Sequence, residues 1–259
     1  MNLRFAIACA SLLLAAFPLL AGEIPPNQRR SGYSFIAPDT KAIQDDDTAN
    51  PGMLFVLDGE TLWKKKIGAA DKSCADCHGD AASTMKGVAA RYPAFDKGLA
   101  RPVNIEQRVN LCRANHQQAS PLAYESHDLL ALTAFVARQS RGVAISTGDD
   151  PALAPFVARG RERFMQRQGQ LNLSCANCHD DNWDRKLAGS AITQAHPTGY
   201  PLYRLEWQSL GSLERRLRSC ISGIRAQAYD YGAPELVELE LYLMSRARGM
   251  AMETPAVRP

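Results

Sequence analysis

A chain of 259 residues, 46% of them apolar, can form one large hydrophobic core or the cores of two small domains. Its 30 basic and 27 acidic side chains nearly balance, so the charge does not indicate a nucleic-acid-binding protein. Beyond residue 22 no apolar run reaches about 18 residues, and we therefore predict no membrane span in the mature chain.

Residues 1–22 predict a secretory signal peptide. Arg4 precedes an almost uninterrupted apolar run over residues 5–20, and Ala21-Gly22 supplies the small residues of a cleavage site. The signal predicts export to the periplasm, an oxidising compartment in which bacteria also attach haem covalently. Cys9 would leave with the signal, so the mature chain would keep six cysteines.

Residues 23–50 contain prolines and polar residues without a clear periodicity. We expect an extended N-terminal arm that wraps a partner subunit or the second half of the chain. From about residue 51 the pattern becomes helical. The lysine run at residues 64–66 predicts a solvated helix face, with a docking site for an acidic partner as the alternative.

The sequence C-x-x-C-H occurs twice, at Cys74–His78 and again 101 residues later at Cys175–His179. This pattern is the attachment signature of c-type haem, in which two thiols add to the porphyrin vinyl groups and the adjacent histidine binds the iron. The motifs predict two covalently bound haems, with His78 and His179 as axial ligands. A zinc ribbon is the alternative, but its ligand pairs usually lie about 15–20 residues apart. The predicted attachment residues are Cys74, Cys77, Cys175 and Cys178.

An internal repeat surrounds the two motifs. Gly59 and Trp63 stand ahead of the first motif at the same distance as Gly160 and Phe164 stand ahead of the second. A glycine and an aromatic residue four positions apart share one helix face, where the glycine lets a second helix approach and the ring fills the crossing. Downstream the offset grows from 101 to 108 residues, which places a seven-residue insertion within residues 179–200.

The repeat predicts two tandem units of one design. We expect a first haem domain at residues 51–142, a linker at 143–154, a second haem domain at 155–250 and a C-terminal tail at 251–259. No convincing strand pattern occurs, so the predicted fold is all-α, with two cytochrome c-like domains. Each unit is small, and a covalently held haem would supply much of its apolar core.

The sequence offers several candidates for the second axial ligand of each iron. Electron-transfer cytochromes c usually use methionine or histidine. Only Cys112 and Cys220 occupy matching positions in both repeats, on helices whose predicted N-caps are Asn104 and Ser212. We favour paired thiolate ligands, with a Cys112–Cys220 disulfide as the alternative and His116 as the rival ligand of the first haem. Further candidates are Met85, Met165, Met244, His127 and His196.

Arg216 lies four residues before Cys220, so both side chains project from one face of a helix. A guanidinium there would hold the sulfur as a thiolate and attract an anion. A surface arginine, or one that binds a haem propionate, is the alternative interpretation. Arg108 has the same relation to Cys112, so the spacing does not decide which haem performs chemistry.

Two C-x-x-C-H motifs, each followed by Arg-x-x-x-Cys, make this exported chain similar to the SoxA family, the dihaem cytochrome subunits of SoxAX complexes of bacterial thiosulfate oxidation. The resemblance covers the whole mature chain. It implies His/Cys ligation of both irons, by His78 with Cys112 and by His179 with Cys220. It further implies that the second haem site is the active one, with a persulfide on Cys220 and with Arg216 as the active-site arginine.

The activity implied by the resemblance is L-cysteine S-thiosulfotransferase, which joins thiosulfate oxidatively to a cysteine of the carrier protein SoxYZ. Electrons would pass through a SoxX-like monohaem partner, bound as a heterodimer, to a small cytochrome c. Two other classes stay open. A dihaem electron carrier predicts methionine or histidine ligands, and a dihaem peroxidase needs one iron with an open position.

Overall fold

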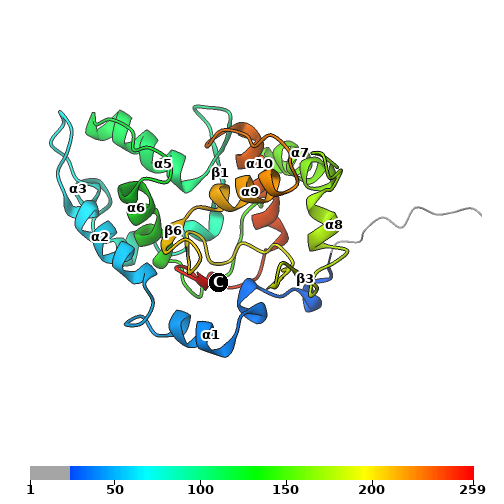
Figure 1. Cartoon of the computed structure of the whole chain (residues 1–259). Helices are drawn as coiled ribbons and strands as arrows, with labels where there is room; N and C mark the ends of the chain where they lie inside the picture. Colours follow the sequence, from blue (N-terminus) through cyan, green and yellow to red (C-terminus); the bar gives the residue numbers. More distant parts are fainter. Residues whose placement is uncertain (1–23) are drawn as a thin grey trace, which may run out of the picture.

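The computed structural model describes residues 24–259, in which two groups of helices lie side by side (Figure 1). In the first repeat, α2 (Gly52–Lys64) packs against α6 (His127–Arg138). In the second repeat, α7 (Ala154–Met165) packs in the same way against α10 (Pro234–Arg246). The predicted signal peptide lies outside the described residues.

Each helix pair crosses at a glycine. A Cβ atom on Gly59 would lie 2.1 Å from the carbonyl oxygen of Ala131, and one on Gly160 would lie 2.1 Å from that of Glu238. The aromatic residue one turn later is buried in each core: Trp63 lies against Phe135 of α6 with ring centroids 5.8 Å apart. Phe164 lies against Tyr242 of α10 at 5.4 Å. The predicted role of the glycine and aromatic pairs is therefore confirmed.

Short helices carry the sequence motifs. The C-x-x-C-H motifs form α3 (Cys74–His78) and α8 (Cys175–His179). The later cysteines lie on α5 (Ile105–Cys112) and α9 (Leu213–Gly223). Asn104 and Ser212 cap these two helices by accepting hydrogen bonds from backbone N–H groups of the first turn, as predicted. The first repeat also has a four-residue helix, α4 (Ala81–Thr84), a 3-10 helix (Ala89–Arg91) and a π-helical turn (Arg113–Gln117).

The expectation of a purely helical fold is corrected by several short strands. One antiparallel hairpin joins β1 (Ala94–Asp96) to β2 (Arg101–Val103) in the first repeat. A hairpin of the same register joins β5 (Leu202–Arg204) to β6 (Ser209–Gly211) in the second. These strands have only three residues, too few for an alternating pattern to show in the sequence. The remaining strands are β3 (Lys186–Leu187), its partner β4 (Ser190–Ala191), and β7 (Val257–Arg258), which pairs with β5 in parallel.

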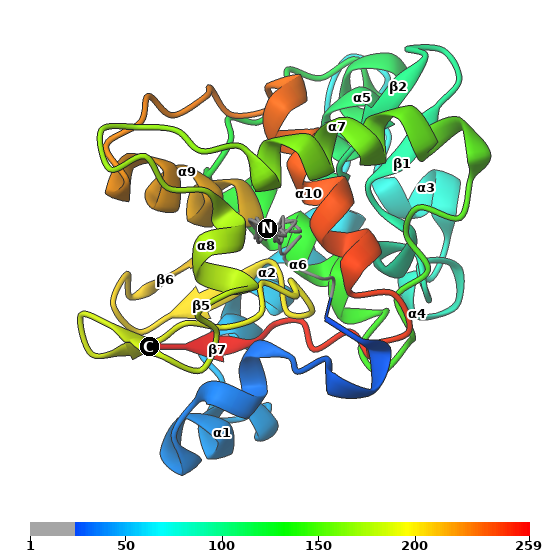
Figure 2. The ribbon, with the colours of Figure 1, turned by 90° about the vertical axis from the view of Figure 1, so that its right-hand side faces the viewer.

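The segment at residues 24–50 is not extended throughout, because it forms two 3-10 turns and helix α1 (Pro38–Asp45). It contacts both repeats. The backbone N–H of Arg30 donates to Gln194 in the second repeat at 2.6 Å, whereas Asp47 accepts from two arginines at the end of α6 at 2.7 Å. Figure 2 shows α1 beside β7 near the C-terminus.

The predicted linker and tail pair with each other. Ala144 forms an isolated antiparallel bridge with Ala251, and the Ile145 N–H donates to the carbonyl of Met250 at 2.9 Å. Ile145 is fully buried. The segment between the two repeats is therefore part of the packed structure. None of the helices in residues 24–259 is long and apolar enough to cross a membrane.

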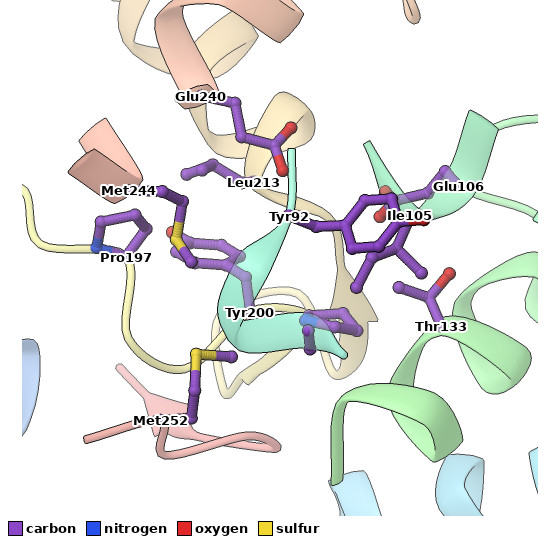
Figure 3. Close-up of a pocket in the computed structure, with 12 residues that line it drawn as sticks. Tyr92, Ile105, Glu106, Thr133, Pro197, Tyr200, Leu213, Glu240, Met244 and Met252 are labelled. Carbon is purple, nitrogen blue, oxygen red and sulfur yellow. The ribbon is translucent and has the colours of Figure 1, made fainter. Parts of the chain in front are cut away.

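Buried polar groups lie where the two repeats meet. Asn104 donates to Glu214 at 3.0 Å and to Glu240 at 3.4 Å. Next to them lies a small cavity lined by Tyr92, Tyr200, Glu106, Glu240 and Thr133, among others (Figure 3). Burial raises the pKa of Glu214 to about 8 and that of Glu106 to about 7, so both carboxyls keep protons at pH values where an exposed glutamate is ionised.

Candidate functional site

Each C-x-x-C-H motif forms one helical turn that a capping box fixes at its N-terminus. Ser174 accepts a hydrogen bond from the Asn177 N–H at 3.3 Å, and the Asn177 side chain accepts from the Ser174 N–H at 3.1 Å. Ser73 and Asp76 make the same exchange at 3.0 and 2.8 Å. The turn holds both cysteines and the histidine as one rigid group.

The loop before each motif is tied to the segment that follows the cysteine-bearing helix. Two backbone hydrogen bonds join these segments in the first repeat, and two join them in the second. They run from Ala69 to Gln118, from Ala70 to Gln117, from Gln170 to Arg225 and from Leu171 to Ile224, at 3.3 to 3.4 Å. Each motif therefore lies against the helix that carries the later cysteine of its own repeat.

Cys112 and Cys220 face different motifs. Burial raises the pKa of the Cys74 thiol, and the neighbouring Cys112 raises it further. Burial likewise raises the pKa of Cys175 to about 12, with a further contribution from Cys220. All six cysteines of the described residues are free thiols. The Cys112–Cys220 disulfide, which was the alternative in the sequence, is therefore absent from residues 24–259, because the two helices belong to separate repeats.

The two motif histidines have different surroundings. Nδ1 of His179 lies 2.6 Å from the carbonyl oxygen of Thr193, so the neutral ring carries its proton on Nδ1 and leaves Nε2 free to bind a metal. Burial lowers the pKa of His179, which favours this neutral form. His78 is exposed and lies against the Trp63 ring, with centroids 5.7 Å apart. Thr193 belongs to the insertion of the second repeat, and no sequence pattern identified its role.

The other candidate ligands do not occupy equivalent positions in the two repeats. Met85 and Met165 pack against the cores of the first and second repeats. Met244 is buried in a third cluster. Nδ1 of His196 donates to the carbonyl oxygen of Arg30 at 3.0 Å, and burial lowers the pKa of His196 to about 4. His127 pairs with an aspartate of α2, and His116 is exposed in the π-helical turn.

The arginine that precedes each later cysteine is neutralised in the first repeat and not in the second. Arg108 donates to Asp96 at 2.6 Å and to the Tyr92 hydroxyl at 3.2 Å. No ion pair within residues 24–259 involves Arg216, although the nearby Arg215 and Arg204 each pair with a glutamate. The positive charge of Arg216 contributes to lowering the pKa of His179. The second repeat thus presents an uncompensated cation beside its motif.

The donor set of each repeat fits a c-type haem. Two free thiols and an imidazole lie on one turn, and a third thiol faces them from the next helix. Over residues 24–259, no group of three or more histidine, cysteine or acidic side chains is arranged to hold a metal ion directly. A zinc ribbon therefore does not form, because the two C-x-x-C pairs lie in different repeats.

Comparison with known proteins agrees with this architecture. A family model of the SoxA/TsdA cytochrome c domain matches residues 58–145 and again residues 159–252. The L-cysteine S-thiosulfotransferase subunit SoxA of Pseudaminobacter salicylatoxidans is 37% identical over 235 residues, which are 90% of this chain and 82% of the relative. The subunit of the same name from Rhodovulum sulfidophilum is 37% identical over 88% of this chain and 80% of its own.

A solved structure also matches. The crystal structure of SoxXA from P. pantotrophus includes a chain with a TM-score of 0.86 and 31% identity, over 89% of this chain and 87% of that one. The double match to the family model agrees with the two helical repeats, and a cytochrome c domain implies c-type haem. The sequence, the fold and these relatives agree over nearly the whole described chain, and the protein belongs to the SoxA family.

Proposed function

We propose that this chain is the SoxA-type subunit of an L-cysteine S-thiosulfotransferase and that its second repeat holds the active site. It would join thiosulfate oxidatively to a cysteine of a SoxYZ carrier protein. The observation that carries the assignment is the contrast between the repeats: among residues 24–259 Arg216 forms no ion pair, whereas Arg108 beside Cys112 is neutralised by Asp96. An uncompensated guanidinium beside a thiol is suited to bind an anionic sulfur compound.

The haems would be held by the two motifs. Cys74 and Cys77 would attach one covalently, and Cys175 and Cys178 the other. His78 and Cys112 would be the iron ligands in the first repeat, and His179 and Cys220 would be those in the second. Bound haem supplies one-electron redox chemistry close to the thiol of Cys220.

The residues of the second repeat bind and position the substrate. Arg216 would hold the sulfonate oxygens of thiosulfate in its planar donor fork and turn the terminal sulfur toward Cys220. A sulfur–sulfur bond would form between this terminal sulfur and the Cys220 thiolate as two electrons leave toward the partner cytochrome. The carrier's cysteine thiolate would then attack the terminal sulfur and release the Cys220 thiolate, so the carrier ends with a thiosulfonate group.

The partners follow from the same proposal. The similarity to a chain of the SoxXA structure supports a heterodimer with a SoxX-like monohaem cytochrome, through which electrons would reach a small cytochrome c. The predicted signal peptide supports a periplasmic location. The resemblance to SoxA also favours a persulfide on Cys220, and mass spectrometry of the peptide that contains Cys220 would show the mass of one additional sulfur atom.

The test compares matched variants of the two repeats. Arg216→Ala and Cys220→Met should each lower the rate of thiosulfate conjugation to the carrier by about 100- to 1,000-fold while both haems stay attached. Arg108→Ala, the matched change in the first repeat, should leave the rate near that of the wild type. Equal losses in both repeats, or an unchanged rate in Arg216→Ala, would reject the second repeat as the active site.

A further inference from the structure

The two repeats carry opposite charges at one equivalent position. The hairpins β1–β2 and β5–β6 have the same register, with Asp96 opposite Arg101 in the first and Arg204 opposite Ser209 in the second. Arg204 therefore stands where Asp96 stands. In the first repeat this position neutralises the arginine of the following helix, at 2.6 Å. In the second repeat it adds another positive charge.

Arg204 is largely buried and only partly neutralised. Its side chain is 12% exposed, and its Nε is buried without a hydrogen-bond partner among residues 24–259. Nη2 donates to Glu206 at 2.8 Å, but that glutamate is 65% exposed and its charge is screened by solvent. The guanidinium carbon lies 5.2 Å from the centre of the Trp207 ring. Burial and then the positive charge of Arg216 lower the pKa of Arg204. The shared hairpin register also brings Arg204 toward Arg216, because Asp96, at the equivalent position of the first repeat, contacts Arg108.

We propose that Arg204 is a second substrate-binding residue, which forms with Arg216 a two-arginine clamp for the doubly charged thiosulfate ion. The inference rests on the proposed function and extends it to a residue outside the Arg-x-x-x-Cys motif. Two like charges close together in a partly buried site are unfavourable until an anion lies between them. A dianion matches two guanidinium groups in charge, and each fork can donate to a separate oxygen pair.

A haem propionate has the same anionic chemistry and is the other candidate partner. The comparison of the repeats favours the substrate. Both repeats carry the same haem-attachment motif, so a position that served a haem propionate would be expected to hold a cation in both. The first repeat holds Asp96 there instead. In the proposed function only the second repeat binds an external anion. The charge reversal therefore matches this difference between the repeats.

The experiment measures the dissociation constant of thiosulfate by titration calorimetry, with the haem-loaded complex of this chain and its SoxX-type partner. Arg204→Gln should weaken binding about 10- to 100-fold, the range expected for loss of a hydrogen bond to a charged group. Arg204→Asp recreates the aspartate–arginine pair of the first repeat and should weaken binding further. Glu206→Gln removes the competing carboxylate and should leave binding equal or tighter, and Asp96→Asn should leave it unchanged.

Haem content and the visible absorption spectrum are recorded for each variant. An unchanged dissociation constant in Arg204→Gln would overturn the clamp, and loss of haem or a shifted spectrum with unchanged binding would assign Arg204 to a propionate. If Arg204→Gln weakens thiosulfate binding but the wild-type complex fails to modify the carrier, the result would support the clamp and reject the conjugating function. Absence of thiosulfate binding in the wild type would reject both.

Discussion

Single residues make the second repeat different from the first. His179 is oriented by the Thr193 carbonyl, and the adjacent Asp180 forms a buried ion pair with Arg246 at 2.6 Å. The Arg246 guanidinium also lies over the Phe164 ring, 4.4 Å from its centre. These contacts fix the residues around the second motif, whereas His78 of the first motif is exposed. The repeat that is proposed to bind substrate is thus also the one whose motif makes more buried contacts.

Electron paramagnetic resonance tests the proposed iron ligands. The oxidised protein should give low-spin ferric signals with thiolate character at both haems, and Cys112→Met and Cys220→Met should each alter a different one. His116→Ala should alter neither, because this side chain is exposed in the turn beyond Cys112. A change of the first haem's signal in His116→Ala would instead identify that histidine as its ligand, and signals typical of methionine in the wild type would favour a plain electron carrier.

The Arg246–Asp180 pair should contribute strongly to stability. The two side chains are 4% and 2% exposed, so Arg246→Ala leaves an unpaired carboxylate in the core and should lower the free energy of unfolding by about 3–5 kcal/mol. Arg248→Ala breaks the exposed pair with Asp149 and should cost less than about 1 kcal/mol. Urea unfolding monitored by tryptophan fluorescence measures both. Similar costs for the two variants would contradict the difference in burial.

At the scale of helices and strands, the sequence identified the elements that repeat and missed those that are short. The glycine and aromatic pairs and the N-caps Asn104 and Ser212 lie where they were predicted. The strands were missed because pairing between distant residues, and not local propensity, stabilises a strand of two or three residues.

The helix crossings can be tested by adding one methyl group. In Gly160→Ala the new Cβ would meet the backbone oxygen of Glu238, so α7 and α10 must separate, and the free energy of unfolding should fall by about 1–3 kcal/mol. Gly223→Ala is the control, because a Cβ there meets no atom within 4 Å and alanine favours the helix. It should be neutral or slightly stabilising. Equal stabilities of the two variants would show that the crossing tolerates a wider separation.

At the scale of the whole molecule, the two repeats form one structure with a shared polar interface. Asn104 of the first repeat donates to Glu214 and Glu240 of the second, and Gln107 donates to the Gly232 carbonyl at 3.0 Å. The linker and the tail add backbone pairing between the segments that follow the two repeats. The repeats are therefore expected to unfold together. Protonation of the buried carboxyls should then affect the free energy of unfolding of the whole chain.

Stability should depend on pH through this interface. Burial raises the pKa of Glu214 from 4.5 to about 8, so the folded chain holds a proton that the unfolded chain has lost between these values. The contribution is fully present below about pH 4.5 and is lost as the pH rises through about 8. Each such proton makes the free energy of unfolding fall by about 1.4 kcal/mol per pH unit within the window. Urea unfolding at several pH values should show a smaller slope for Glu214→Gln.

The exposed Glu206 provides the control for that series. Glu206→Gln should keep the wild-type slope between about pH 5 and 8, because this side chain is 65% exposed and solvent screens its charge in the folded chain. A Glu214→Gln variant that kept the full slope would show that other groups cause the pH dependence. Glu106, whose pKa burial raises to about 7, is the next residue to test.

The sequence by itself determined the two C-x-x-C-H motifs, the tandem repeat, the helix crossings and the position of the later cysteines. These features depend on local spacing, which the order of residues records directly. Only the tertiary structure decided that Thr193 orients His179, that Arg108 is neutralised by Asp96, and that Arg216 forms no ion pair within the described residues. Charge and hydrogen bonding at a site depend on residues that folding brings together from separate elements, and a motif does not contain them.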